Sequence, residues 1–338
     1  MDADSVRKDK EFEMHMPKTV GNALRGVPRR GVAASMAIWG TPQRAFPTGV
    51  RQGGTLPFGR FLTLWLAAAV VAFCATCFAA EGLDYPLSIA VHRSGTIYLA
   101  DRNVPGVWRL EGDRLSLFFR GSKKFRTPLG AIRCVALDRE GKLLAGDSAT
   151  SDVYRFDETG TPRALTAQGK PYGQIGIPIG IAVDADGNLL VSDLETHRIV
   201  KVSKEGGQVQ PFAAVPAPRG LFYDSHKQLW VISGRRLVLV SAAGEQKTVV
   251  DDGVFLFPHT VVAAEDGTAY VCDGYAKAVW KIPPGGKPER WVSGSPLDNP
   301  VGMDLQQGKL FVVDPRARAV LEIDGKGSLT RRNTASGG

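Results

Sequence analysis

Two arginines and one histidine occupy equivalent places in separate copies of one local pattern, and their chemistry suits the recognition of an anion. Arg133, Arg219 and His259 each follow the first residue of an apolar strand pattern. Two guanidinium groups can clamp a carboxylate or a phosphate, and an imidazole adds a hydrogen-bond donor that depends on pH. The alternative interpretation is structural: the arginines form ion pairs with nearby aspartates, and His259 hydrogen-bonds a neighbouring loop.

Acidic side chains recur at a second equivalent place, the end of the next strand pattern in each copy. Aspartate at the start of a turn commonly accepts hydrogen bonds from backbone N–H groups. The fourth copy carries Ser233 at this place. We therefore expect the remaining members to be structural turn acceptors: Asp101, Asp147, Asp193, Asp273 and Asp314.

The clearest copy of the pattern spans residues 177–202. It runs from a Pro-x-Gly sequence through an apolar strand, turns at Asp186-Gly187-Asn188, and continues into a strand that ends at Asp193. A third strand pattern and a weaker fourth follow in every copy. The closing positions lie 46, 46, 40, 40 and 41 residues apart, at 101, 147, 193, 233, 273 and 314. Four short strands in a period of about 40 residues are typical of a propeller blade.

Six such units fill residues 81–338, which predicts an all-β fold: a six-bladed β-propeller of four-stranded antiparallel blades. A closed ring of blades leaves no sheet face exposed, so we expect a single domain. In such a blade the first strand begins, and the second strand ends, on the same face of the ring. The residues that follow the first position of each inner strand, including Arg133, Arg219 and His259, should therefore converge on the mouth of the central channel.

The third copy resembles the NHL repeat family of six-bladed propellers. The resemblance rests on the pattern Pro-x-Gly-Ile-Ala-Val-Asp, followed by Asp-Gly-Asn-Leu, Val-x-Asp and His-Arg-Ile-x-Lys. The resemblance covers residues 84–334 and is strongest in 177–202 and 257–282. It implies the propeller fold. It leaves the function open, because propellers of this kind include scaffolds, sensor domains and some enzymes.

The repeat around Pro258-His259 also resembles those of the peptidyl-α-hydroxyglycine α-amidating lyases, in which a histidine after proline from each of three blades binds a metal. Only His259 matches, and Arg133 and Arg219 stand at the corresponding positions of two other blades. A zinc site needs three protein ligands, and cations repel a metal ion, so we expect neither a metal nor a cofactor. A metal-dependent gluconolactonase-like or lyase-like enzyme that uses the same channel remains the alternative.

The N-terminal quarter of the chain carries other signals. Residues 1–59 are rich in Gly, Pro and Arg without strand or helix periodicity, which indicates a disordered or mis-started extension. Residues 60–80 combine Arg60 with an uncharged apolar run that ends in small residues, as in a signal peptide or an N-terminal anchor. The protein is therefore expected to be exported, to the periplasm, the cell surface or the medium, and to contact a membrane only if residues 61–80 are not cleaved.

The net charge of +8 does not indicate a nucleic-acid partner. Residues 1–60 carry ten Lys and Arg against five Asp and Glu, so residues 81–338 retain only +3. Such a small surplus of positive charge does not form the basic surface that a nucleic-acid phosphate backbone requires. Cys134 and Cys272 fall in the second and fifth units, on opposite sides of the ring, where we expect two buried free thiols.

Together these features predict a non-catalytic binding module, expected to be monomeric. Its partner is an unidentified protein or a small anionic ligand, bound at the channel mouth by Arg133, Arg219 and His259.

Overall fold

The computed structural model describes residues 82–124 and 126–332, and these form six four-stranded antiparallel sheets. The first three sheets comprise β1 (Pro86–Val91), β2 (Ile97–Asp101), β3 (Gly106–Glu111) and β4 (Arg114–Arg120); β5 (Ile132–Leu137), β6 (Leu143–Asp147), β7 (Asp152–Phe156) and β8 (Pro162–Ala164); β9 (Pro178–Val183), β10 (Leu189–Asp193), β11 (Arg198–Val202) and β12 (Gln210–Ala214). The others comprise β13 (Pro218–Tyr223), β14 (Leu229–Ser233), β15 (Arg236–Val240) and β16 (Gln246–Val250); β17 (Pro258–Ala263), β18 (Ala269–Asp273), β19 (Ala278–Ile282) and β20 (Glu289–Ser293); β21 (Gly302–Gln306), β22 (Lys309–Asp314), β23 (Ala319–Ile323) and β24 (Leu329–Arg331).

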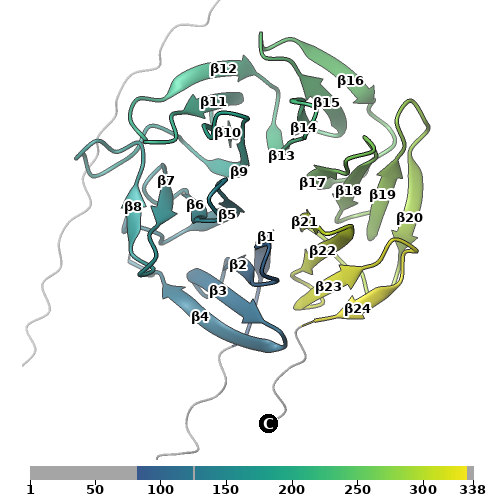
Figure 1. Cartoon of the computed structure of the whole chain (residues 1–338), viewed down its shortest axis with the longest axis horizontal. Coiled ribbons are helices and arrows are strands. Elements are labelled where there is room, and N and C mark those ends of the chain that lie inside the picture. Colours follow the sequence, from purple (N-terminus) through teal and green to yellow (C-terminus); the bar gives the residue numbers. More distant parts are fainter. Residues whose placement is uncertain (1–81, 125, 333–338) are drawn as a thin grey trace, which may run out of the picture. The chain divides into compact units, whose positions relative to one another are not determined.

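The six sheets are the blades of a propeller, as the repeat spacing predicted (Figure 1). The first strand of each blade lies nearest the central axis and the fourth forms the rim. Among the described strands, each sheet is built from one continuous stretch of chain, and the two ends of the ring exchange none of them. Within the described residues, no helix has the length and apolar character needed to cross a membrane. The predicted extension 1–59 and signal or anchor 60–80 lie outside these residues.

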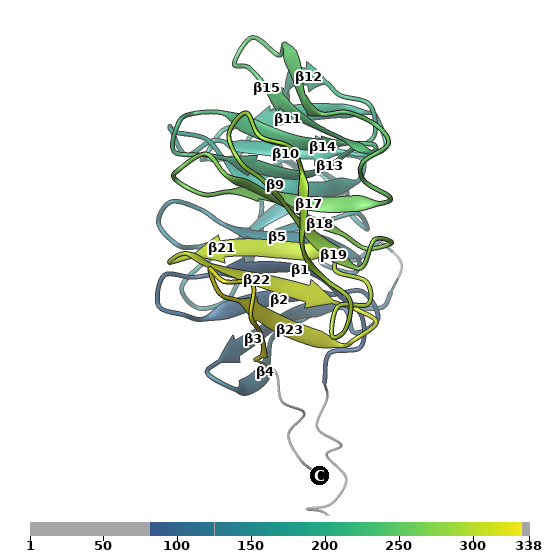
Figure 2. The same ribbon diagram turned by 90° about the vertical axis from the view of Figure 1, so that its right-hand side faces the viewer.

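The apolar core consists of layers between neighbouring blades. Six clusters of buried side chains are present, and each draws its members from two adjacent sheets. Figure 2 shows the ring of blades from its side. Both faces of a blade are therefore buried, which explains why second strands such as β10 and β14 are buried along their whole length.

The Pro-x-Gly sequence is explained by the close approach of the inner strands. A Cβ atom on Gly180 would stand 2.6 Å from the Arg219 carbonyl oxygen, and one on Gly220 would stand 2.6 Å from the His259 carbonyl oxygen. Both contacts are shorter than real Cβ contacts allow, so these positions require glycine. Small hydroxyl side chains also connect neighbouring blades. Thr260 Oγ1 donates to the Val301 carbonyl at 2.8 Å, and Ser192 Oγ, from the second strand β10, donates to the Arg219 carbonyl at 2.7 Å.

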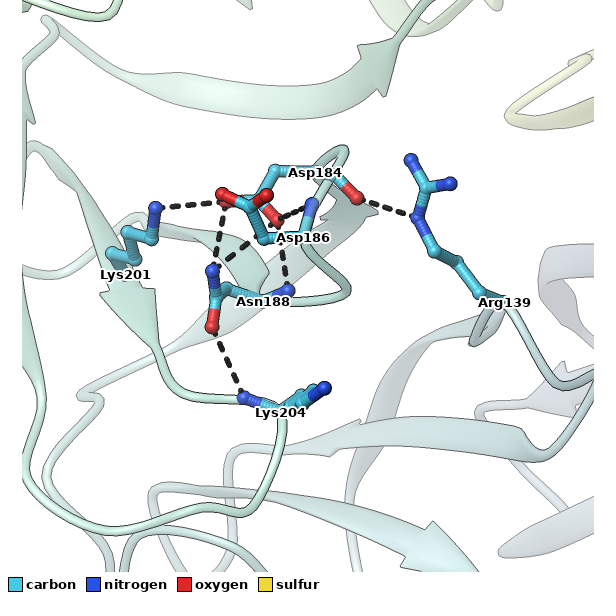
Figure 3. A network of polar contacts seen from close by, with 6 residues as sticks. All are labelled: Arg139, Asp184, Asp186, Asn188, Lys201 and Lys204. Atoms are coloured by element: carbon cyan, nitrogen blue, oxygen red, sulfur yellow. Dashed lines mark hydrogen bonds and ion pairs between the residues drawn. The ribbon is translucent and has the colours of Figure 1, made fainter.

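The Asp-Gly-Asn sequence of the third blade lies in the turn between β9 and β10 (Figure 3), at the opposite end of β10 from the closing Asp193. Asp184 Oδ1 accepts the backbone N–H groups of Asp186 at 2.9 Å and Asn188 at 2.8 Å, and Asp184 Oδ2 pairs with Lys201 at 2.8 Å. Arg139, from the second blade, donates through Nε to the Asp184 carbonyl at 2.8 Å. The motif thus closes one hairpin and joins it to the preceding blade, which is a structural role.

Cys134 and Cys272 are free and buried, in agreement with the expectation from their places in the repeat. Burial raises the pKa of both thiols to about 12, so neither is a reactive thiolate near neutral pH.

Candidate functional site

The three residues proposed for ligand binding all occupy β-bulges. The ladder between the first and second strands skips Arg133 in β5, Arg219 in β13 and His259 in β17. A bulged residue is left out of the regular pairing and its side chain is redirected. The bulge follows the first residue of the strand, at the end of the inner strand where the channel opens.

Two of the three residues belong to one cluster, which is centred on Phe257. The Arg219 guanidinium carbon lies 4.0 Å from the centre of the Phe257 ring. The His259 ring meets Phe257 edge-on at 4.8 Å between centroids, and Tyr275 stacks on Phe257 at 4.7 Å with 19° between the planes. The cluster joins β13 of the fourth blade to β17 and the β18–β19 turn of the fifth.

Arg219 carries a charge that no described residue neutralises. Among the described residues it has no ion pair, and its buried Nε atom has no hydrogen-bond partner. Burial lowers the pKa of the guanidinium below its ordinary value, with Tyr275 acting in the opposite direction. A guanidinium retains its proton under all ordinary conditions, so the positive charge persists in this partly buried place.

His259 differs electrostatically from the sequence-based expectation. Burial, and next the positive charge of Arg219, lower the pKa of the imidazole to about 4, although Asp273 acts to raise it. The ring is therefore neutral from pH 5 to 8. It can donate one hydrogen bond and accept another, but it is not the pH-dependent cationic donor that the sequence suggested.

Arg133 lies apart from this cluster, in the second blade. Its Nε donates to Ser148 Oγ at 2.9 Å, and Ser148 Oγ in turn donates to the Ala131 carbonyl at 3.2 Å. The structure thus brings Arg219 and His259 together through Phe257 and gives Arg133 a separate partner on its own blade.

The closing aspartates hold the loops that border the channel mouth. Asp273 Oδ2 accepts the Leu256 N–H at 2.7 Å, and Oδ1 accepts the N–H groups of Phe257 at 2.8 Å and Ala276 at 3.1 Å. Corresponding backbone N–H groups are bound by the other members of the set: Asp101, Asp147, Asp193 and Asp314. Within the described chain, none of these carboxylates forms an ion pair with Arg133 or Arg219.

Ser233 replaces the closing aspartate because the hairpin of the fourth blade is shorter. Two residues, 234 and 235, connect β14 to β15, whereas four residues, 194–197, connect β10 to β11. The short turn supplies no row of loop N–H groups for a carboxylate, and Ser233 Oγ instead donates to the Pro216 carbonyl at 2.9 Å. A depression of about 400 Å³ lies beside this turn, lined in part by Arg235, Arg236, Asp251 and Asp252.

The side chains that line the central channel are mostly apolar. Its cavity of about 290 Å³ is lined by the first strands of all six blades. Asp304 is the acidic residue of this lining; its Oδ2 accepts the Val91 N–H at 2.7 Å and its Oδ1 accepts the Leu305 N–H at 2.8 Å. Burial raises its pKa to about 6.

The residues at the channel mouth do not fit the three-histidine metal site of the amidating lyases. In the described part of the chain, no group of three or more His, Cys, Asp or Glu side chains is placed to hold a metal ion. His259 stands next to a guanidinium, and a permanent positive charge opposes the binding of a cation at that imidazole.

Sequence reasoning missed Phe257, Tyr275 and Leu256. Phe257 directly precedes the Pro258-His259 pair, and Tyr275 lies two residues beyond Asp273. The sequence does show an aromatic residue at each of these two loop positions. Only the fold of the fifth blade shows that the two rings stack on each other and form part of one site.

The fold and the site define a class: a six-bladed β-propeller with a cationic and aromatic cluster at one mouth of its channel. The sequence pattern of the NHL repeat matches residues 176–202, which form the inner three strands of the third blade. This match confirms the predicted resemblance to the NHL repeat in the third blade, and the six sheets confirm the predicted six-bladed propeller.

A weaker similarity connects the chain to the peptidyl-glycine alpha-amidating monooxygenase A of Xenopus laevis, at 29% identity over 143 residues. The match covers 37% of this chain and 15% of the length of that relative.

Two solved structures share the fold. Virginiamycin B lyase from Staphylococcus aureus gives a TM-score of 0.58 at 13% identity, covering 75% of this chain and 86% of the lyase. A gluconolactonase from Xanthomonas campestris gives 0.57 at 15% identity, covering 69% of this chain and 84% of that protein. At these identities the likeness concerns the architecture alone.

Proposed function

We propose that this propeller is a non-catalytic binding module that binds an anionic ligand through Arg219 at the channel mouth. One observation carries the proposal: the guanidinium is partly buried and has no ion pair among the described residues. Removing a charge from water without a counter-charge is costly, and an incoming anion reduces that cost.

Hydrogen-bond geometry supports the same proposal. A guanidinium presents several N–H donors in a planar fork that matches a carboxylate or a phosphate. Phe257 stacks against this group at 4.0 Å and restricts its orientation. An anion would thus meet a donor group that is already positioned, and the neutral imidazole of His259 lies close enough to Phe257 to border the same space.

A second candidate function is a lyase-like or lactonase-like enzyme that uses the same channel mouth. It is supported by the neutral imidazole of His259, which can accept a proton, and by the propeller fold shared with a lyase and a gluconolactonase. Elemental analysis of the purified protein separates the metal-dependent form of this idea from the first proposal. A stoichiometric divalent metal would favour the enzyme, and metal-free protein that still binds anions would favour the binding module.

The proposed function is tested by titrating the purified full chain with acetate, benzoate and inorganic phosphate in a calorimeter. Arg219→Gln should weaken the binding of these anions about tenfold or more, as expected when a charge-assisted hydrogen bond is lost. Arg133→Gln is the matched control, because Arg133 occupies the same bulge position but donates to Ser148. Equal affinities of wild type and Arg219→Gln would contradict the proposal.

A further inference from the structure

The anion site adjoins an aromatic surface that faces solvent. Three large apolar side chains are exposed in the described residues; one of them, Tyr275 at 62% exposure, stacks on Phe257, and another, Leu256 at 53%, directly precedes Phe257 in the chain. Asp273 holds their loops together, because it accepts the Leu256 N–H and lies two residues before Tyr275. Exposed apolar groups that gather at one place commonly mark a binding surface.

The exposed aromatic surface adjoins the positively charged Arg219 guanidinium. Phe257 contacts the Arg219 guanidinium at 4.0 Å and the Tyr275 ring at 4.7 Å, so a single ring links the cationic group to the exposed phenol. The three groups come from β13, the connection 251–257 and the β18–β19 turn. A ligand that reaches Arg219 therefore passes or covers an apolar surface at the same time.

The connections of the fourth blade next to Arg219 are short. The connection from the third to the fourth blade has three residues, 215–217, and the β14–β15 turn has two. By contrast, the connections 121–131 and 165–177, at the first three blades, are more than three times as long as 215–217. The depression of about 400 Å³ lies at these short segments, and its lining includes Pro216 and Ala217, which directly precede the strand that carries Arg219.

We propose that the ligand of this site is an aromatic carboxylate, with its carboxylate on Arg219 and its ring against Tyr275 and Leu256. This inference rests on the proposed function and specifies its ligand class. Inorganic phosphate or acetate would satisfy the guanidinium and leave the apolar surface in water. An aromatic acid satisfies both, because ring stacking and apolar burial add to the charge-assisted hydrogen bonds.

The test compares four probes on the purified full chain: acetate, 3-phenylpropionate, 3-phenylpropanamide and N-acetylphenylalanine. Wild type should bind 3-phenylpropionate about tenfold or more tightly than acetate, which corresponds to one stacked ring of contact. The uncharged amide should bind far more weakly than the acid. Comparable or tighter binding of N-acetylphenylalanine would identify the carboxyl end of a peptide chain as a source of the ligand, and weaker binding would identify a free small acid.

Two variants test separately the aromatic contact and the charged contact of the proposed ligand. Tyr275→Ala should reduce the preference for 3-phenylpropionate over acetate to about threefold or less and leave the affinity for acetate unchanged. Arg219→Gln should weaken both acids. Tyr172→Ala, which removes the third exposed large apolar side chain from a different connection, is the matched control and should change neither affinity. Tyr275 is mostly exposed, so its removal should leave thermal unfolding nearly unaltered, which is checked by calorimetry.

The outcomes separate the two proposals. If wild type binds acetate and 3-phenylpropionate equally and Arg219→Gln weakens both, the aromatic inference is wrong and the anion site stands. If Tyr275→Ala leaves the preference for the aromatic acid intact, the ring lies elsewhere and the inference is also overturned. If neither acid binds, or if Arg219→Gln has no effect, the proposed function itself fails.

Discussion

The chemistry of the channel mouth depends on individual residues that depart from the repeat. Arg219 and His259 occupy bulges, so neither is constrained by the regular ladder between the first two strands. Their proximity affects both: the guanidinium helps to hold His259 in its neutral form, and Phe257 lies between the two groups as a shared neighbour. The result is one permanent positive charge, on Arg219, beside a neutral imidazole.

This arrangement predicts that anion affinity is nearly independent of pH. His259 has a pKa of about 4, so it remains neutral between pH 5.5 and pH 8, and the charge of Arg219 is constant. The affinity of the purified chain for benzoate should vary by less than about twofold across this range. Calorimetric titrations at several pH values measure it. A rise of several-fold as the pH falls below 6.5 would show that His259 is protonated with the ligand bound.

The loops of the site are positioned by closing carboxylates at the ends of second strands. Asp273 gathers the N–H groups of Leu256, Phe257 and Ala276, so the connection that carries Phe257 is held by the turn that carries Tyr275. In the fourth blade the shorter β14–β15 turn makes this arrangement unnecessary, and Ser233 forms one hydrogen bond to Pro216. The replacement of the closing aspartate by Ser233 thus coincides with a loop between the second and third strands that is two residues shorter.

The two closing positions should therefore differ in their importance for stability. Asp273→Ala leaves three N–H groups without their acceptor and should lower the free energy of unfolding by about 2–4 kcal/mol. Ser233→Ala removes one hydroxyl and should lower it by about 1 kcal/mol or less. Urea unfolding followed by tryptophan fluorescence measures both. Similar losses for the two variants would show that the carboxylate does not organise the loop.

At the scale of the whole propeller, the ring closes by side-by-side contact rather than by exchange of a strand. The first and sixth blades share an apolar cluster that includes Trp108 and Phe311. Two polar links join the same blades: Asp304 accepts the Val91 N–H at 2.7 Å, and Arg318 pairs with Asp84 at 2.8 Å. Closure therefore depends on an apolar cluster and on polar links, one of which involves Asp304 in the lining of the central cavity.

The closure should weaken as Asp304 ionises. Because its folded-state pKa of about 6 lies above the ordinary value of 3.8, the folded state binds the proton more tightly than the unfolded state. The stabilising contribution is complete below pH 3.8 and is lost as the pH rises through 6. Between pH 4 and pH 7, wild type should lose about 1–3 kcal/mol of unfolding free energy relative to Asp304→Asn, which imitates the protonated acid.

Urea unfolding of both proteins at the two pH values measures this difference. Asp324→Asn is a control of opposite sign, because hydrogen bonds within its exposed turn lower the pKa of Asp324, and its contribution is lost as the pH falls. An Asp304→Asn variant that follows the pH dependence of wild type would show that Asp304 is ionised throughout.

The sequence by itself determined the architecture. Strand alternation, Gly-containing turns and a period of about 40 residues are local features, and six copies of one blade can bury their faces only by stacking in a ring. The structural use of Asp-Gly-Asn in 177–202 and the buried free thiols at Cys134 and Cys272 follow from place in the repeat alone. The same logic singled out the positions one residue after the start of an inner strand, and the structure shows that Arg133, Arg219 and His259 form bulges there.

The tertiary structure decided which of those positions act together. Arg133, Arg219 and His259 are equivalent in the repeat, yet only Arg219 and His259 share a neighbour, because Phe257 comes from the connection between their adjacent blades. The neutral state of His259, the missing counter-charge of Arg219 and the exposure of Tyr275 all depend on what other segments place around them. Burial and electrostatic potential are sums over neighbours distant in the chain, and no local pattern contains those sums.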